Sequence, residues 1–530
     1  MGAHTFMGLK GKPLSIAQIA LVVAPAFVIF GYNQAGLGGL ITEDDWNKTF
    51  PEIDTTNTTG AVKSRHSTIQ GLVVATLTLG ALVGALSCSY TGDRFGRRHV
   101  IFMAGVCSLI GTILEASSFS LAQFIVGRII MGFGVGNLSA CVPVWQSETS
   151  DAQSRGRHVV LDGLFCILGY VLESWIDLGF YFKTGPVTWR APIAISAFFS
   201  LVLISAIYFL PESPRWLVRK GRVSEARVVI SAVRGYDDDS MEVNSELQGI
   251  EISSEETAKH AAKLTDLLKM GDDKLLYRFG LCILLQFYQQ MSGTNLVSVY
   301  TTILFQNNLG MSAENSRTLS GGALTWKFCA AFVAFFCIDR FGRRACFIVS
   351  GTGMSACMVC LAICSSMGAE NRPAQIAGGV FLYLFNFFVP IGFLGANYLY
   401  CTEVAPLRLR VAMSSISTAN HWLWNFVVLM VTPVALDSIG WRYYIVYCVI
   451  GACIPLSIYF FYPETMGRNL EELDLMFRDS PSVWATVRFA NKRPIAMPQE
   501  FIAQHQEEKL GVERRSSVEE DSGAEKAAMA

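Results

Sequence analysis

The sequence predicts an all-α membrane protein with twelve transmembrane helices in two six-helix bundles and with both termini in the cytoplasm. Hydrophobic residues make up 52% of the 530 residues and charged residues only 16%. Apolar windows longer than about eighteen residues recur along the chain without an alternating pattern, so they should cross lipid as helices and not as barrel strands. The string DRFGRR occurs twice, at 93–98 and at 339–344, which indicates two related halves.

The predicted spans follow one another with mostly short polar loops between them. The first half carries spans at roughly 14–40, 67–90, 99–118, 121–143, 158–180 and 190–210. The second half carries spans at roughly 276–306, 318–338, 345–367, 374–402, 411–434 and 441–462. The first span is too long for a signal peptide and lacks the small-residue cleavage pattern, so we expect it to remain as a membrane helix.

Two looser repeats support the division into halves. SETSDAQSRGR matches TEVAPLRLR, and PESPRW matches PETMGR, each with an offset close to that of DRFGRR. The polar, acidic C-terminal segment has the composition of a disordered tail. The predicted organisation is an N-terminal bundle at 1–211, a cytoplasmic linker at 212–275, a C-terminal bundle at 276–479 and a disordered cytoplasmic tail at 480–530.

Arginines and lysines of the short loops gather on one side of the predicted membrane, and the positive-inside rule makes that side cytoplasmic. The loop after the first span then faces outside, and it carries glycosylation-type triplets at Asn47 and Asn57. The repeated acids and arginines at the cytoplasmic helix ends can pair when the inner mouth is closed and separate when it opens. These predicted gating residues are Asp93, Arg97, Glu148 and Arg155 in the first half and Asp339, Arg343, Glu403 and Arg410 in the second. A topology signal alone is the alternative for each basic cluster.

Several function classes are not supported. A net charge of −1 gives no reason to expect a nucleic-acid partner, and the cysteines, nearly all inside spans, suggest neither a disulfide framework nor a metal site. No nucleophile and base pair or phosphate loop is evident, so we expect no enzyme and no cofactor. The lipid bilayer and a small solute are the expected partners of a monomer.

The motifs closely resemble those of the sugar porters of the major facilitator superfamily, from about residue 15 to about residue 475. They are GDRFGRR, VGRIIMGFGVG, VPVWQSE, RGR, PESPRWL, QQMSGTN, the second DRFGRR and PETMGRNLEELD. VPVWQSE and VRFANKRP are most similar to a fungal branch that includes glycerol/proton symporters. The resemblance implies a fold with alternating access to a site at the membrane midplane.

The resemblance places hydroxyl-binding amides at Gln289, Gln290 and Asn295, and a gate tyrosine at Tyr300. Amides suit polyhydroxylated ligands because they donate and accept hydrogen bonds without charge. Since Gln290 and Asn295 do not share a face of a straight helix, a bend near Gly293 is required. Interhelical bonding is the alternative role of these amides.

Other positions that the resemblance places in the pocket differ in residue type. The aromatic position of span 10 is Tyr398. Span 11 supplies His421, Trp422 and Asn425, with His421 at a position that is usually an amide. Two amide positions are lost, at Gly163 next to Asp162 and at Lys327. The predicted pocket is therefore more charged than a plain hexose site.

A coupling position also differs. Proton-coupled members of the family carry an aspartate in span 1 that faces an arginine in span 4, whereas this chain has Asn33 facing Arg128. An amide cannot bind a proton at ordinary pH, which favours facilitated diffusion, with Asp162 as the alternative proton carrier. A structural ion pair is the alternative role of Arg128.

Lys327 lies twelve residues before Asp339 in the eighth span, about 18 Å from the charged end and near the middle of the hydrocarbon layer. Three interpretations stay open. Lys327 binds an anionic substrate, pairs with Asp162 across the half-to-half boundary, or snorkels from a tilted helix without function.

The predicted function is transport of a sugar, polyol or sugar acid across the plasma membrane by alternating access, without proton coupling. One alternative is a transporter of a specialised metabolite on the same scaffold. The other is a sugar sensor that does not transport, for which the tail of roughly fifty residues is short.

Overall fold

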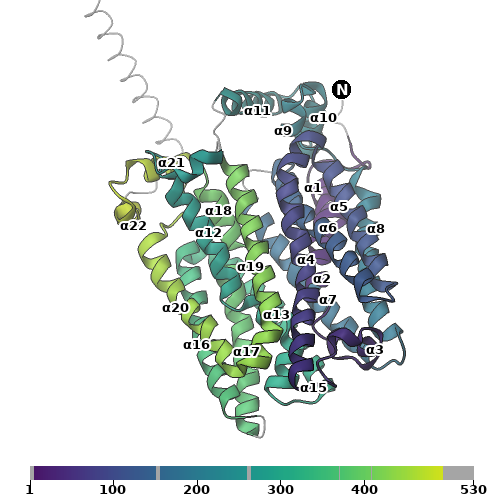
Figure 1. Cartoon of the computed structure of the whole chain (residues 1–530). Helices are drawn as coiled ribbons and strands as arrows, with labels where there is room; N and C mark the ends of the chain where they lie inside the picture. The colour runs from purple at the N-terminus through teal and green to yellow at the C-terminus, as the bar shows by residue number, and fades with distance from the viewer. Residues whose placement is uncertain are drawn as a thin grey trace, which may run out of the picture.

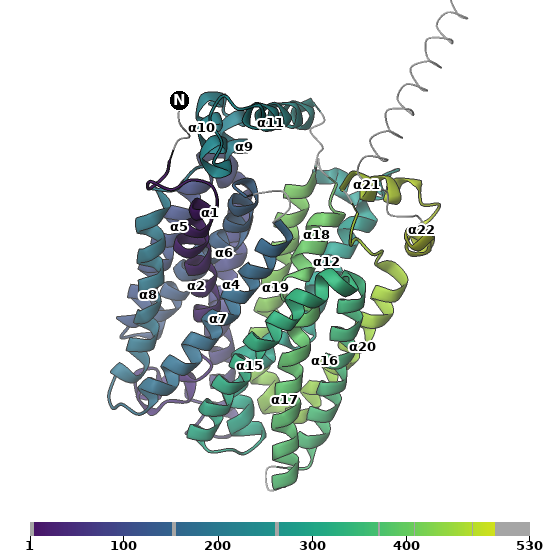
Figure 2. The ribbon, with the colours of Figure 1, turned by 180° about the vertical axis from the view of Figure 1, so that it is seen from behind.

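The computed structural model describes residues 5–150, 155–259, 264–368, 371–406, 409–468 and 470–492. Helices dominate this part of the chain, and Figures 1 and 2 show them gathered in two bundles that lie side by side. Within the described residues, eleven segments are long and apolar enough to cross a membrane. The remaining predicted span, the seventh, is broken near Gly293 and again near Tyr300 into shorter helical segments. The predicted twelve-helix membrane fold is confirmed.

The N-terminal bundle holds the first six spans. The first is built from α1, a π-helical turn and α2, and the bounds of the helices are α1 (Lys12–Gln18), α2 (Ala24–Ala35), α4 (Gly60–Phe95), α5 (Arg97–Ala116), α6 (Leu121–Glu148), α7 (Arg155–Tyr181) and α8 (Val187–Ile207). Buried apolar side chains of α2, α4, α5, α6 and α8 form its core.

The C-terminal bundle repeats this arrangement with two broken spans. Its helices are α12 (Leu275–Met291), α13 (Thr294–Val299), α15 (Ala313–Phe341), α16 (Arg343–Ser366), α17 (Arg372–Phe393), α18 (Ala396–Val404), α19 (Arg410–Ser438) and α20 (Tyr443–Phe461). The break between α12 and α13 lies at Gly293, whose φ of 92° is a left-handed conformation that favours glycine. The predicted bend near Gly293 is confirmed.

The two bundles meet along two pairs of helices. α4 packs against α19 on the face seen in Figure 1, and α7 packs against α15 on the face seen in Figure 2. We name the end that carries both DRFGRR loops the inner end, and the end that carries α3 (Asp44–Thr49) the outer end, following the orientation predicted from the arginines. A buried apolar cluster at the outer end contains residues of both bundles, among them Leu37, Tyr300 and Leu429.

Helices of the linker and of the C-terminal segment cover the inner end. α9 (Pro214–Arg219), α10 (Val223–Arg234) and α11 (Met241–Lys259) share a small apolar core around Trp216 and Ile230. α21 (Leu470–Asp479) is held to the start of α12 by an ion pair between Arg278 and Asp474.

The tail begins later than the sequence predicts. Residues 480–492, assigned to a disordered segment, form a helical turn at Val483–Ala485 and the helix α22 (Thr486–Lys492). Apolar packing against α20 explains the order, since the rings of Trp484 and Phe461 lie 5.0 Å apart. The rest of the predicted tail, 493–530, lies outside the described residues.

The two predicted glycosylation sites differ in accessibility. Asn47 lies in α3 with only 5% of its surface exposed, because α3 packs its aromatic residue Trp46 into the core of the outer end. This burial contradicts the prediction for Asn47. Asn57 is exposed and its amide donates to Asp54 at 3.0 Å, so Asn57 stays a predicted site.

Candidate functional site

A chain of buried amides runs along the break in the seventh span. The Asn295 amide of α13 donates to Gln290 Oε1 of α12 at 2.5 Å, so the turn at Gly293 brings together two side chains that a straight helix would separate. Gln289 Nε2 donates to the carbonyl of Phe393 at 3.0 Å, next to the break in span 10. Two broken helices thus meet at these amides.

His421 of α19 joins the two glutamines. Its Nδ1 lies 2.9 Å from Gln289 Oε1, an acceptor, and Gln290 Nε2, a donor, lies 2.9 Å from Nδ1 and 3.2 Å from Nε2. At Nδ1 a neutral imidazole either donates to Gln289 or accepts from Gln290, according to its tautomer. His421 therefore acts in this structure as one more neutral donor and acceptor, as the amide it replaces would.

Asn397, at the start of α18, extends the network. Its amide donates to Gln289 Oε1 at 2.8 Å and to Gln286 Oε1 at 3.1 Å. Sequence reasoning placed neither Asn397 nor Gln286 in the site, although Gln286, Gln289 and Gln290 follow the i, i+3, i+4 spacing of one helix face.

Several polar atoms of this region have no hydrogen-bond partner. Both side-chain polar atoms of Asn425, one turn after His421 on α19, are buried and unpaired, and so are Gln286 Nε2 and Asn397 Oδ1. Buried polar atoms normally find partners. The arrangement can bind a ligand that offers both hydroxyl donors and acceptors.

The aromatic residues of the predicted site take three different places. Tyr398 lies beside His421, with ring centroids 5.6 Å apart. Trp422 is fully buried and crosses to the N-terminal bundle, where its ring lies 5.0 Å from Phe30 and its Nε1 donates to Ser139 at 3.4 Å. Tyr300 donates to the carbonyl of Leu429 at 2.9 Å in the cluster that closes the outer end.

Lys327 and Asp162 do not form the ion pair that we considered. The Lys327 ammonium, 4% exposed, donates to Ser298 of α13 at 2.6 Å and lies 5.6 Å from the Tyr170 ring centroid. Asp162 is buried, and its Oδ1 has no hydrogen-bond partner. The helix break places Ser298 within reach of Lys327, which accounts for the difference. Snorkelling is also contradicted, because the ammonium stays inside the protein.

We expect the effects of Lys327→Met and Asp162→Asn on stability to add. Residues without a shared contact usually behave additively within about 0.5 kcal/mol, whereas a broken buried ion pair would cost about 3 to 5 kcal/mol that the double variant regains. Thermal unfolding of the purified single and double variants measures this. Recovery in the double variant would mean that the two charges pair in another conformation.

Arg128 of α6 contacts three other helices of the N-terminal bundle, α2, α4 and α5. Its guanidinium donates to the backbone carbonyls of Asn33 at 3.3 Å and Val74 at 3.0 Å. Its nearest carboxylate is Glu115 of α5, at 4.0 Å, and both side chains are buried. The Asn33 amide donates instead to Ile29 of its own helix at 2.9 Å. Sequence reasoning missed Glu115, although a carboxylate within an apolar run was a signal.

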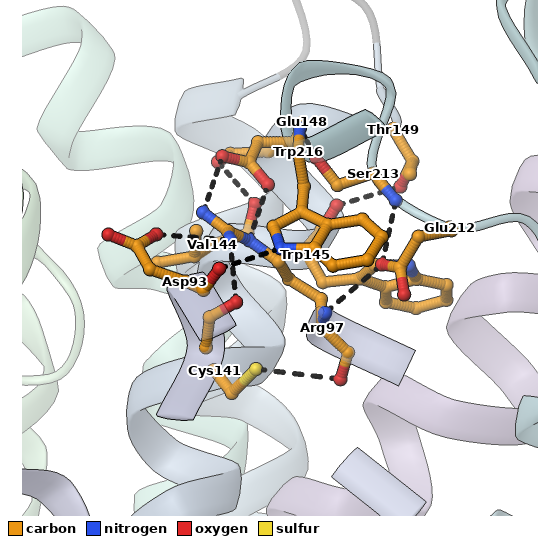
Figure 3. A network of polar contacts seen from close by, with 12 residues as sticks. Asp93, Arg97, Cys141, Val144, Trp145, Glu148, Thr149, Glu212, Ser213 and Trp216 are labelled. Carbon is orange, nitrogen blue, oxygen red and sulfur yellow. Dashed lines mark hydrogen bonds and ion pairs between the residues drawn. The ribbon is translucent and has the colours of Figure 1, made fainter. Parts of the chain in front are cut away.

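The inner end of the N-terminal bundle holds a network of polar contacts (Figure 3). The Arg97 guanidinium makes a bidentate contact with Glu148, at 3.0 and 3.3 Å, and bonds Asp93 at 3.3 Å. Asp93 also accepts from Arg219 of the linker at 2.9 Å. Asp93, Arg97 and Glu148 thus lie together, and these contacts stay within one bundle and its linker.

A third acid, Glu212, completes this corner and was missed by sequence reasoning. Its carboxylate accepts the backbone N–H groups of Arg97 at 3.1 Å and Arg98 at 3.2 Å, so it caps the start of α5. Gly96, the residue before α5, has a φ of 91°, which favours glycine. A Cβ at this position would lie only 2.7 Å from a Glu212 oxygen, so the absence of a side chain leaves room for the carboxylate.

The C-terminal bundle repeats the same corner. Arg343 bonds Glu403 at 3.1 Å, and Glu464 accepts the backbone N–H groups of Arg343 at 3.1 Å and Arg344 at 3.0 Å. The repeat of PESPRW by PETMGR therefore preserves a helix cap. Arg410 donates to its own loop at Ala405, and the side chains of Arg155 and Asp339 lie outside the described part of the structure.

Residues 19–477 match the family described as "Sugar (and other) transporter". The "Sugar transporter STL1" of Saccharomyces cerevisiae is 33% identical over 92% of this chain and 85% of its own length. The "MFS-type transporter oryC" of Aspergillus oryzae is 33% identical over 95% of this chain and 92% of its own length. A solved structure of the proton:xylose symporter XylE bound to 6-bromo-6-deoxy-D-glucose has a TM-score of 0.73 at 22% identity, covering 88% of this chain and 100% of that chain.

Proposed function

Because this chain belongs to the sugar (and other) transporter family, we propose that it moves a sugar, polyol or sugar acid across the plasma membrane by alternating access. The observation that carries the proposal is the buried amide network between the broken spans 7 and 10 and α19. Its unpaired atoms on Asn425, Gln286 and Asn397 match a ligand with several hydroxyl groups.

The contacts between the bundles support alternating access. In the described part of the chain, the ion pairs that join the two bundles lie at the outer end, where Lys63 of α4 meets Asp437 of α19 at 3.3 Å and Arg317 of α15 approaches two acids of the other bundle. At the inner end, the contacts that Arg97 makes with Glu148 and Glu212, and those that Arg343 makes with Glu403 and Glu464, stay within the same half of the protein. Such an arrangement suits two rigid bundles that rock about a central site.

Facilitated diffusion is the proposed mode. Asn33 cannot titrate, and its amide bonds its own helix, so the span 1 position offers no proton carrier opposite Arg128. Buried carboxyls near the pathway include Glu115, which lies beside Arg128, Glu173, which lines a small cavity together with Asn33 and Arg128, and Asp162.

We expect the purified protein in liposomes to equilibrate its substrate without concentrating it. A panel of labelled glucose, xylose, glycerol, mannitol and gluconate, offered with and without an inward proton gradient, measures both specificity and mode. Equal plateaus with and without the gradient are expected, and a protonophore should change nothing. Accumulation that collapses with the protonophore would overturn the facilitated mode and direct attention to Glu115 and Asp162.

A specialised metabolite is the second candidate substrate, favoured by the buried charges of Lys327 and Asp162 beside the boundary of the bundles. Uptake of none of the panel compounds, in a protein that is folded and monodisperse, would support this candidate over the first.

A further inference from the structure

The outer end holds a buried arginine that bonds the opposite bundle. Arg317, in the second turn of α15, is 2% exposed, and its Nη2 donates to the Gly39 carbonyl at 3.0 Å and to Thr42 Oγ1 at 2.8 Å. Its guanidinium also lies over the Tyr181 ring, 4.1 Å from the centroid. Arg317 belongs to the C-terminal bundle and all these partners to the N-terminal bundle. Their separation must accompany any opening of the outer end.

Two carboxyl groups face this cation, and a third lies next to one of them. Glu43 follows the first span, and Asp177 and Glu173 lie one turn apart on α7. Arg317 lies 3.9 Å from Glu43 and 3.9 Å from Asp177, both just beyond hydrogen-bond distance. Each of these acids is at least 95% buried.

The acids leave buried oxygens without partners. Neither carboxylate oxygen of Glu43 accepts a hydrogen bond of good geometry, although Thr188 is a polar neighbour that favours its charged form. Asp177 Oδ1 and Glu173 Oε1 have no hydrogen-bond partner either. The titratable and charged groups that face Glu43 are Asp45 on α3, Asp177 on α7 and Arg317 on α15, and Glu173 and Tyr32 face Asp177 in turn. One guanidinium carries a single positive charge and cannot neutralise three buried carboxylates. Each buried carboxylate without a compensating charge is costly in free energy.

The closed outer end also excludes water by direct packing. A Cβ on Gly38 would lie 2.1 Å from the Val299 carbonyl of α13, and one on Gly39 would lie 1.9 Å from an Asp177 oxygen. The backbone of the first span therefore contacts the seventh span and the acid cluster directly. Opening this contact would hydrate the acids and remove the reason for any of them to stay neutral.

We propose that the outer gate closes with a proton bound at Glu43, beside Asp177 and Arg317, so that external acid holds the gate shut. The inference rests on the proposed alternating-access function and on the predicted orientation. The proton enters Glu43 from the outer solution as the gate closes and returns to the same solution as it opens, so no proton is carried across. Transport is then pH-sensitive and still facilitative.

The sign of the effect follows from the environment of Glu43. Burial, with the Asp177 charge as the next cause, raises the pKa of Glu43 from 4.5 to about 7 in the closed gate. Exposure to water on opening would return it toward 4.5, so closure takes up a proton. The closed state is favoured most below the open-state pKa, and this advantage is lost as pH rises through the closed-state pKa.

Electron–electron distance measurements on the full chain in lipid nanodiscs test this without a substrate. Genetically encoded spin-label residues at Glu52 and Ser438, exposed sites on opposite bundles at the outer end, avoid labelling the fourteen native cysteines. The distance distribution should contain a closed and an open population. We expect the ratio of the closed to the open population to fall roughly tenfold or more between pH 5.5 and pH 8. Glu43→Gln, which mimics the protonated acid, should remain closed at both pH values.

Two further variants keep the test decisive. Glu314→Gln removes an exposed acid of the first turn of α15, and it should respond to pH as the parent does. Asp177→Asn removes the neighbouring negative charge and should move the response to lower pH. This variant tests the proposal even if Glu43→Gln does not fold. The proposal would be overturned if the distance distribution of the parent protein did not change with pH, or if Glu43→Gln responded to pH as the parent does. Failure to transport sugars or polyols would leave this readout intact, so the two proposals fail separately.

Discussion

Arg128→Met is expected to cost about 3 to 5 kcal/mol of stability, because it leaves the buried Glu115 carboxylate without its cation. The carbonyls of Asn33 and Val74 would lose their donors in the same change. Adding Glu115→Gln removes the orphaned charge and should recover most of the loss. Thermal unfolding of the detergent-purified variants gives the measurement.

Arg128→Lys is the matched control, since it keeps the charge while losing the planar donor geometry. It should fall between the parent and Arg128→Met. If Arg128→Met and the double variant unfold at the same temperature, the pair with Glu115 contributes nothing, and the carbonyl contacts alone account for the loss.

Gln290→Ala and Asn295→Ala are expected to abolish substrate binding while the protein still folds. Gln290 bonds both Asn295 and His421, so its loss removes two network bonds and frees the imidazole to turn away from the site. Together with the lost ligand contacts, this change should reduce the binding free energy by about 2 to 4 kcal/mol, which is roughly thirtyfold to a thousandfold in affinity.

Transport into liposomes and binding to the purified protein measure the effect. Asn386→Ala is the matched control, because Asn386 is equally buried on α17 but its amide donates only to its own helix, at Leu382. It should retain substrate affinity. An unaltered half-saturation in both Gln290→Ala and Asn295→Ala would assign these amides to helix packing.

Local composition was enough to predict the helices and their order. A segment long enough to cross lipid must satisfy its own backbone, so apolar length alone identified the spans. The break at Gly293 was also predictable, because Gln290 and Asn295 could share a ligand only if the helix turned between them. The repeat of DRFGRR indicated two bundles before any contact was known.

Charge partners were decided only by the tertiary structure. Lys327 and Asp162 occupy facing spans, yet the broken helix brings Ser298 to the ammonium and leaves the carboxylate alone. Arg128 meets Glu115 and not the side chain of Asn33, and Asn47 turned out to be buried because α3 packs inward.

The sequence by itself determined the membrane-spanning helices, the twofold repeat and the set of amides available for hydroxyl groups. Helix formation and membrane insertion depend on windows of neighbouring residues, which a sequence displays directly. Pairing of buried charges depends on distances of a few ångströms between residues that are tens to hundreds of positions apart. Only the packing of one bundle against the other decided that Arg317 lies beside Glu43 and Asp177, where we propose that the outer gate is sensitive to protons.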